Sequence, residues 1–164
     1  ELTRLTTSCS TDVSKRVGVV TKKQAEKHQL QLIPFGIAAV NFAKSNAICL
    51  VREYAPNSYQ LLGVGAGQPN RVDSLQRLAI PKAIENLKAE HADVPNYDPR
   101  QDLEKCVLMS DGFFPFDDSV LEAAKHGVRT IVQPGGSTND QSVIAAADQQ
   151  EMCMIFTGER YFYH

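Results

Sequence analysis

The central stretch of this chain reads Ser110-Asp111-Gly112-Phe113-Phe114-Pro115-Phe116-Asp117-Asp118. It follows an apolar run, residues 106–109, that is typical of a short buried strand. It precedes residues 119–127, which are typical of a helix because Ser119 suits the N-cap and Gly127 suits a left-handed C-terminal position. We therefore expect the stretch at a strand-to-helix crossover, the end of an open α/β sheet at which ligands bind.

Three aromatic rings and three carboxylates in one crossover admit two interpretations. An ordinary turn needs Gly, Asn or Ser rather than three Phe residues, which favours a ligand-binding loop. Alternatively, the rings fill the space beneath a loop, and Asp117 and Asp118 simply favour the positive N-terminus of the following helix. The stretch alone does not decide between the two.

Composition limits the classes of partner. The chain has 164 residues, of which 43% are hydrophobic and 22% charged, and a formal net charge of -2, as expected for one globular domain. This charge gives no basic field that would attract nucleic acid or an anionic membrane, so a few local groups would have to hold any anionic ligand. No apolar run approaches the roughly 18 residues that span a bilayer.

The four cysteines, Cys9, Cys49, Cys106 and Cys153, are too far apart in sequence for a zinc knuckle or a redox pair. The last three lie in apolar, strand-like runs. We interpret them as buried free thiols of a reducing compartment, and we expect a cytoplasmic protein.

The second half of the chain alternates strand and helix patterns, which is typical of a parallel sheet covered by helices. The expected elements are strands at 106–109, 128–133 and 152–157 and helices at 119–127 and 139–150. In the first half, residues 47–51 and 59–64 are expected to pair as an antiparallel hairpin. The sequence therefore predicts an α/β fold with a mixed sheet.

Residues 1–16 are polar and rich in Thr and Ser, and we interpret them as an N-terminal arm. Residues 17–164 are expected to form a single domain. Within it, residues 22–31 fit either a helix or a connector. Residues 32–43 carry one apolar face and predict a helix with Pro34 in its first turn.

Residues 72–90 predict a long helix that Pro81 kinks or interrupts. The residues expected on its core side are Leu75, Leu78 and Ala79. The tail, residues 158–164, holds an Arg, three aromatic residues and a His, and we expect it to fold back over the sheet.

Polar groups next to the expected strands are candidate ligand contacts. Asn46 lies at the mouth of strand 47–51, where it could equally be a turn residue. The glycines of residues 65–67 allow close backbone approach, and Arg71 can clamp a phosphate or carboxylate, although the dinucleotide fingerprint is not completed. Lys27-His28 invites a catalytic interpretation, but neighbouring side chains on a helix diverge, so we favour a solvated face.

Five segments, taken in order, carry a family resemblance. They are Lys44-Ser45-Asn46-Ala47-Ile48, Gly63-Val64-Gly65-Ala66-Gly67-Gln68-x-x-Arg71-Val72-Asp73-Ser74, Ser110-Asp111-Gly112-Phe113-Phe114-Pro115-Phe116, Gln133-Pro134-Gly135-Gly136-Ser137-x-x-Asp140 and Thr157-Gly158-x-Arg160-x-Phe162-x-His164. Together they resemble the C-terminal half of AICAR transformylase, the formyl-transfer domain of the bifunctional purine biosynthesis protein. The resemblance runs from about Val17 to His164.

The resemblance implies a three-layer α/β/α fold with a mixed sheet, like that of cytidine deaminase. It also implies transfer of a formyl group from 10-formyltetrahydrofolate, the co-substrate, to the amine of the purine nucleotide AICAR during IMP biosynthesis. Because the chain has no His-x-Glu and no Pro-Cys-x-x-Cys, the zinc chemistry of true deaminases is excluded. The family builds its active site between subunits, so we expect a homo-oligomer, most simply a dimer.

Residue roles follow from the matching positions. Asn46 corresponds to a catalytic Asn that contacts the base and the formyl group, and an amide can donate to a tetrahedral oxyanion. Arg71, Phe113 and Arg160 correspond to nucleotide-binding positions, in keeping with anion binding by a guanidinium and stacking by a ring. Asp118 and Phe114 correspond to the folate pocket, and His164 corresponds to a structural terminal position.

One family motif is missing. The first half of the family's transformylase domain carries Lys-His-x-Asn-Pro-x-Gly, which stabilises the oxyanion and transfers a proton. Here neither Lys27-His28 nor Lys125-His126 continues in that pattern, so we assign no catalytic role to either.

Three functions remain open. The chain is part of a formyltransferase whose Lys-His comes from a partner chain, or it is a non-catalytic module that binds a nucleotide or folate. A generic doubly wound nucleotide binder has less support, because no phosphate-loop signature is present.

Overall fold

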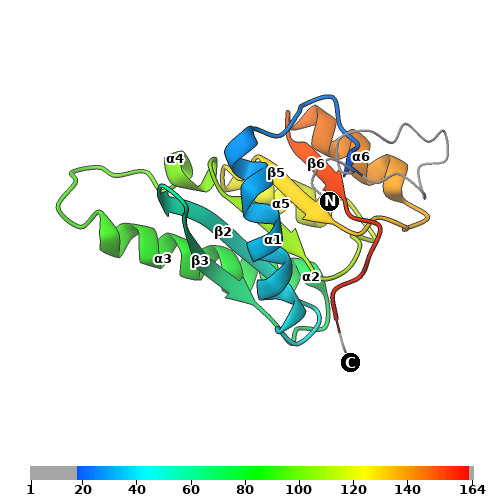
Figure 1. Cartoon of the computed structure of the whole chain (residues 1–164), viewed down its shortest axis with the longest axis horizontal. Coiled ribbons are helices and arrows are strands. Elements are labelled where there is room, and N and C mark those ends of the chain that lie inside the picture. The colour runs from blue at the N-terminus through cyan, green and yellow to red at the C-terminus, as the bar shows by residue number, and fades with distance from the viewer. Residues whose placement is uncertain (1–17, 163–164) are drawn as a thin grey trace.

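A mixed open sheet forms the centre of the computed structural model, which describes residues 18–162 (Figure 1). Its strands lie in the order β1-β6-β5-β4-β2-β3. Their bounds are Gly18–Val19 (β1), Ile48–Ala55 (β2), Ser58–Gly65 (β3), Val107–Ser110 (β4), Thr130–Gln133 (β5) and Cys153–Phe156 (β6). Strands β4, β5 and β6 are parallel, whereas β2, β3 and β1 pair antiparallel to their neighbours. The predicted mixed sheet and its hairpin are confirmed, whereas the expected arm, residues 1–16, lies outside the described residues.

Helices cover both faces of this sheet. Their bounds are Lys27–Asn41 (α1), Arg71–Asp73 (α2), Ser74–Ala79 (the π-helix η3), Ile80–Glu90 (α3), Arg100–Leu103 (α4), Asp118–Lys125 (α5) and Asp140–Gln149 (α6). Alternate strand residues divide the core: Cys49 and Val51 pack with α1, whereas Ile48 and Leu50 pack with α3 on the opposite face. Figure 1 shows α1 crossing in front of the strands. None of the helices within residues 18–162 is long and apolar enough to cross a membrane.

Helix α1 begins earlier than the sequence predicts. It starts at Lys27, so the segment 22–31, for which the sequence allows a helix or a connector, is helical from residue 27 onward. Pro34 lies inside the helix rather than in its first turn. The N-cap is Glu26, whose main-chain N–H donates to Oε1 of Gln29 at 3.0 Å. Glu26 and Gln29 form a capping box, but Glu is not among the favoured N-cap residues, so the start of α1 lacks the usual N-cap signal in the sequence.

The segment 71–90 is helical throughout, but its turns are not uniform. The N–H of Ile80 donates to the carbonyl of Leu75, the wider spacing of a π-helix, and Pro81 falls in the first turn of α3. This change of phase places Leu75 and Ala79 in the core as predicted but leaves Leu78 38% exposed, which corrects the expectation for Leu78.

The backbone of β3 packs directly on η3 because two glycines remove the side chains between them. A Cβ on Gly65 would lie 1.9 Å from the carbonyl oxygen of Ser74, and one on Gly63 would lie 2.2 Å from that of Ala79. No real Cβ approaches backbone so closely, so strand and helix would have to separate to admit one. This contact fixes where the helix that carries Arg71 begins.

Replacement of Gly65 by Ala is therefore expected to destabilise the fold by about 2 kcal/mol or more, because rigid backbone must move to admit the methyl group. Urea unfolding followed by circular dichroism measures the change. The matched control is Ser58→Ala, at the partly exposed start of the same strand, which should change the free energy of unfolding by less than about 0.5 kcal/mol. Equal stabilities for the two variants would contradict the direct packing of β3 on η3.

Candidate functional site

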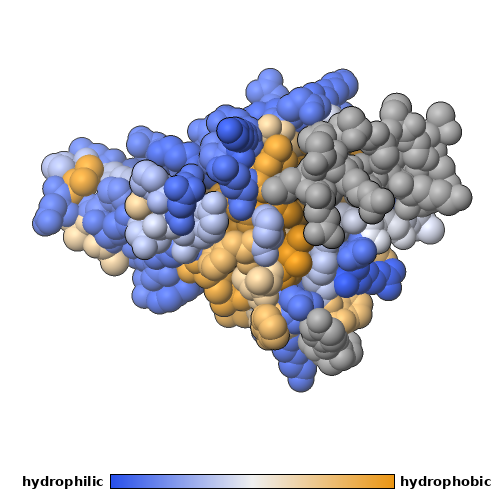
Figure 2. All heavy atoms as spheres, in the orientation of Figure 1, coloured by the Kyte–Doolittle hydropathy of each residue, from blue (hydrophilic) through white to orange (hydrophobic). Residues whose placement is uncertain are grey.

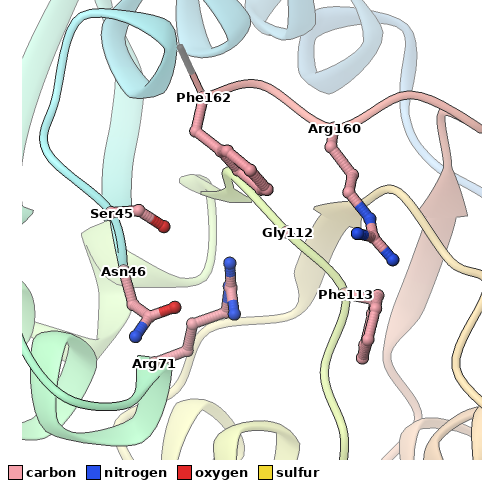
Figure 3. Close-up of a pocket in the computed structure, with 7 residues that line it drawn as sticks. All are labelled: Ser45, Asn46, Arg71, Gly112, Phe113, Arg160 and Phe162. Atoms are coloured by element: carbon pink, nitrogen blue, oxygen red, sulfur yellow. The ribbon is translucent and has the colours of Figure 1, made fainter. Parts of the chain in front are cut away.

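A pocket lies at the end of the sheet at which β3, β4 and β6 finish and β2 begins (Figure 3). It is a cavity of about 240 Å³, lined by Ser45, Asn46, Arg71, Gly112, Phe113, Arg160 and Phe162. Four of these residues are the predicted nucleotide contacts, which the fold brings together from four separate segments. Ligand pockets usually measure about 300–1,000 Å³, so this chain alone encloses a small cavity.

The guanidinium of Arg71 is held against the central stretch by Asp111. Nε and Nη2 of Arg71 both donate to Oδ1 of Asp111, at 3.1 and 2.9 Å. The Asp111 side chain is fully buried, whereas that of Arg71 is 15% exposed. A Cβ on Gly112 would lie 2.0 Å from Nη2, so the guanidinium occupies space that only a glycine leaves.

Asn46 presents an oxygen rather than a donor to the pocket. Its Nδ2 donates to the main-chain oxygens of Gln68 and Pro69, each at 2.9 Å. Only an amide NH₂ can serve two carbonyls, which fixes the orientation of this side chain. Figure 3 shows Oδ1 turned toward the cavity. The expected donation to an oxyanion does not fit this arrangement, in which Asn46 can accept a hydrogen bond from a ligand.

The main chain of Asn46 is also held in place. Its carbonyl accepts from the hydroxyl of Ser74 at 2.6 Å, and the peptide bond between Ser45 and Asn46 is cis. The carbonyl of Lys44 accepts from the N–H of Gly67 at 2.8 Å. The segment before β2 is thus tied to the segment after β3.

The sequence predicts a tail that folds back over the sheet, and the described part of the tail lies beside the central stretch with Tyr161 packed against the core on the α1 face. The N–H of Tyr161 donates to the carbonyl of Asp111 at 2.8 Å. The guanidinium carbon of Arg160 lies 4.9 Å from the centre of the Phe113 ring, within range of a cation–π contact. The terminal His164 lies outside residues 18–162.

The rest of the central stretch has mixed environments. Phe114 is fully buried in the core, and its N–H donates to Oε1 of Gln133. Phe116 is 61% exposed. Phe114 thus fills the core beneath the loop, as the second interpretation predicts, whereas Phe113 lines the pocket, so the ligand-binding interpretation stays a prediction.

The start of α5 differs from the predicted one, and it holds Asp118, a predicted folate contact. The N-cap is Asp117 rather than Ser119, which is buried inside the helix. Oδ1 of Asp118 accepts from the N–H of Ser119 at 2.6 Å. Asp118 is exposed, and neither it nor Phe114 lines the pocket, so their predicted folate contacts lie outside this cavity.

The other reactive groups lie elsewhere. Lys27 and His28 are in the first turn of α1, and neither lines the pocket. Cys49, Cys106 and Cys153 are buried and free, as predicted. Burial raises the pKa of the Cys49 and Cys106 thiols to about 12 and that of Cys153 to about 11, so these thiols stay protonated. Over residues 18–162 no group of three or more His, Cys, Asp or Glu side chains is arranged to hold a metal ion.

Replacement of Asn46 by Asp is expected to destabilise the protein by about 1–3 kcal/mol, because a carboxylate oxygen would face the two carbonyls that the amide NH₂ now serves. Chemical denaturation measures this change. The control is Asn96→Asp, in an exposed loop with a positive φ that Asp also tolerates. If the two variants are equally stable, the assigned orientation of the Asn46 amide is wrong.

Comparison with known proteins gives one consistent result. Residues 5–82 match the protein family described as AICARFT/IMPCHase bienzyme. The chain is 44% identical over 146 residues to the bifunctional purine biosynthesis protein PurH of Leuconostoc mesenteroides, and the aligned part is 89% of this chain and 25% of that protein. The PurH proteins of Lactobacillus acidophilus and Streptococcus pneumoniae are 43% and 42% identical, over 89% of this chain and 24% of each relative.

The chain thus spans about a quarter of the length of the curated relatives that it matches. The family match at residues 5–82 includes Ser45, Asn46 and Arg71 of the pocket lining. The chain is therefore homologous to part of the bifunctional purine biosynthesis protein PurH.

Proposed function

We propose that this chain forms the nucleotide-holding part of an AICAR formyltransferase and acts in cytoplasmic purine biosynthesis. In this proposal it corresponds to the C-terminal half of the transformylase, with residues 17–164 as one cytidine-deaminase-like domain. The observation that carries the proposal is the pocket itself, where Asn46, Arg71, Phe113 and Arg160 lie together. These are the positions that the sequence resemblance assigns to the nucleotide.

The chemistry of the pocket suits an anionic nucleotide with an amine. Arg71 and Arg160 supply positive charge, and the ring of Phe113 supplies a stacking surface. Oδ1 of Asn46 can accept a hydrogen bond from the amine of AICAR. This hydrogen bond would orient the lone pair of the amine nitrogen toward the formyl carbon of 10-formyltetrahydrofolate. Asp118 remains the proposed folate contact because its carboxylate is exposed, whereas the buried Phe114 can act on the folate only by shaping the loop.

The pocket has no evident general base. Its described lining residues include neither a carboxylate nor an imidazole, and removal of a general base typically costs about 10²–10⁴-fold in rate. We propose that a partner segment with the Lys-His motif completes the site. The same observation favours the alternative, a non-catalytic module that holds a nucleotide or folate without converting it.

Titration of AICAR into the chain, beside a formyl-transfer assay, tests the proposal. We expect the lone chain to bind AICAR but to turn it over very slowly or not at all. Arg71→Ala should weaken binding because an anion contact is lost, whereas the control Lys27→Ala, outside the pocket, should leave it unchanged. Thermal melts must accompany Arg71→Ala, because this change leaves the Asp111 carboxylate buried without its partner.

Addition of a chain that carries Lys-His-x-Asn-Pro separates the two functions. Restored turnover supports the formyltransferase, whereas binding without turnover supports the non-catalytic module. Failure of the wild-type chain to bind either AICAR or 10-formyltetrahydrofolate would overturn both. Robust turnover by the lone chain would show that it holds a base of its own.

We also propose a homo-oligomer, most simply a two-fold dimer. Apolar residues gather around the lower part of α1 in Figure 2, and Phe42, which follows α1, is 87% exposed. Light scattering at about tens of micromolar, where such dimers should persist, should give a mass above the 18.1 kDa of one chain. A monomer at that concentration would count against the proposal, and Lys82→Ala, on an exposed helical position, is a control that should not change the mass.

A further inference from the structure

The pocket-lining segments meet at Asp111. Its main-chain N–H donates to the carbonyl of Ala47, next to Asn46, at 3.1 Å. Its carbonyl accepts from Tyr161, which lies between Arg160 and Phe162 in the tail. Its carboxylate binds Arg71. One buried residue therefore contacts the three segments that approach the central stretch.

The carboxylate of Asp111 is unusually dependent on Arg71. Oδ1 receives both donated N–H groups of Arg71, and Oδ2, although buried, has no hydrogen-bond partner among the described residues. Arg71 is also the one oppositely charged group that pairs with it in residues 18–162. A buried carboxylate with so little compensation is costly, so the contact must serve a purpose other than stability.

We propose that Asp111 is a positioning residue that acts on the anionic ligand only through Arg71. The inference rests on the proposed function in one respect, that the ligand is AICAR. Asp111 holds Nε and Nη2 from one side, and Gly112 leaves the space that the guanidinium fills. The N–H groups of Arg71 that Asp111 does not bind are thereby fixed in direction before a ligand arrives, so little rotational freedom is lost on binding.

The direction in which Asp111→Asn changes the affinity for an anion separates this positioning role from a simple charge effect. A carboxylate near an anion site repels the ligand, so removal of its charge should strengthen the binding of any anion. If Asp111 positions Arg71, Asp111→Asn should weaken binding instead, because the amide is a poorer partner for the guanidinium and releases it. The two expectations have opposite directions.

The experiment measures the affinity of the full chain for AICAR by calorimetry. Asp111→Asn is expected to weaken binding about tenfold or more, a loss typical of a misplaced binding group. The matched control is Glu90→Gln, which makes the same chemical change in front of another arginine, Arg52, that lies outside the pocket lining. It should change the affinity less than about twofold.

A double-mutant cycle tests whether the effect passes through Arg71. In an Arg71→Met background, Asp111→Asn should cause no further loss of affinity. A loss that persists in that background would reveal a structural role and overturn the proposal. Unchanged or tighter binding of AICAR by Asp111→Asn alone would overturn it as well.

A ligand-free measurement keeps the proposal testable if a variant does not fold or if AICAR does not bind. The Nε–H resonance of Arg71, assigned by its absence in Arg71→Met, should exchange with water at least about tenfold more slowly than that of exposed Arg77, because it is bound to a buried carboxylate. Exchange as fast as that of Arg77 would overturn the positioning role. If the Nε–H of Arg71 exchanges slowly but the chain does not bind AICAR, only the proposed function is rejected. Inorganic phosphate would then replace AICAR as the ligand in the double-mutant cycle.

Discussion

The position of β4 in the sheet is the constraint on which the site depends. This buried strand pairs antiparallel with β2 on one side and parallel with β5 on the other. The chain that leaves β4 therefore meets the chain that enters β2, and it also lies beside the chains that leave β5 and β6. Polar groups distant in sequence gather at that edge because the strand directions require it, in keeping with the general rule for open α/β sheets. Arg71 lies against the loop that follows β4. This loop therefore needs a small residue, Gly112, and a buried acid, Asp111, at that point.

A second constraint comes from the helix that follows β3. Backbone-to-backbone contact through Gly63 and Gly65 sets the distance between strand and helix, and the π-helix η3 adjusts the helical phase within that contact. Arg71 lies in the first turn of this helical segment, which Asn70 caps through a 2.8 Å hydrogen bond from the N–H of Asp73. The side chain of Arg71 thus extends from a backbone position that the packing of β3 on η3 fixes. Precision in a binding site is achieved more readily in this way than by a residue on a free loop.

Sequence reasoning recovered the sheet better than it recovered the site. Alternating apolar runs and helical patterns predicted the parallel half and the hairpin, because burial on both faces leaves a clear signal. Local signals failed where several residues could serve one purpose: at α5 three successive residues could each cap the helix, and Ser119 was the wrong choice. The exposure of Leu78 could not be predicted because a uniform helical period does not anticipate a π-helix. Asp111 was missed as a partner of Arg71, although an acid directly after a buried strand was a usable signal.

The pairing of β1 with β6 has a consequence for the order of events during synthesis on the ribosome. The hydrogen bond from Met154 to the hydroxyl of Thr21 joins groups 133 positions apart, and β1 has β6 as its neighbour in the sheet. Strand β1 therefore cannot form this pairing until β6 has emerged. Arg160 and Phe162 emerge later still, so a nascent chain can complete its central strands and yet lack a finished pocket. Long-range closure of this kind makes folding slow, and it delays ligand binding until Arg160 and Phe162 have joined the pocket.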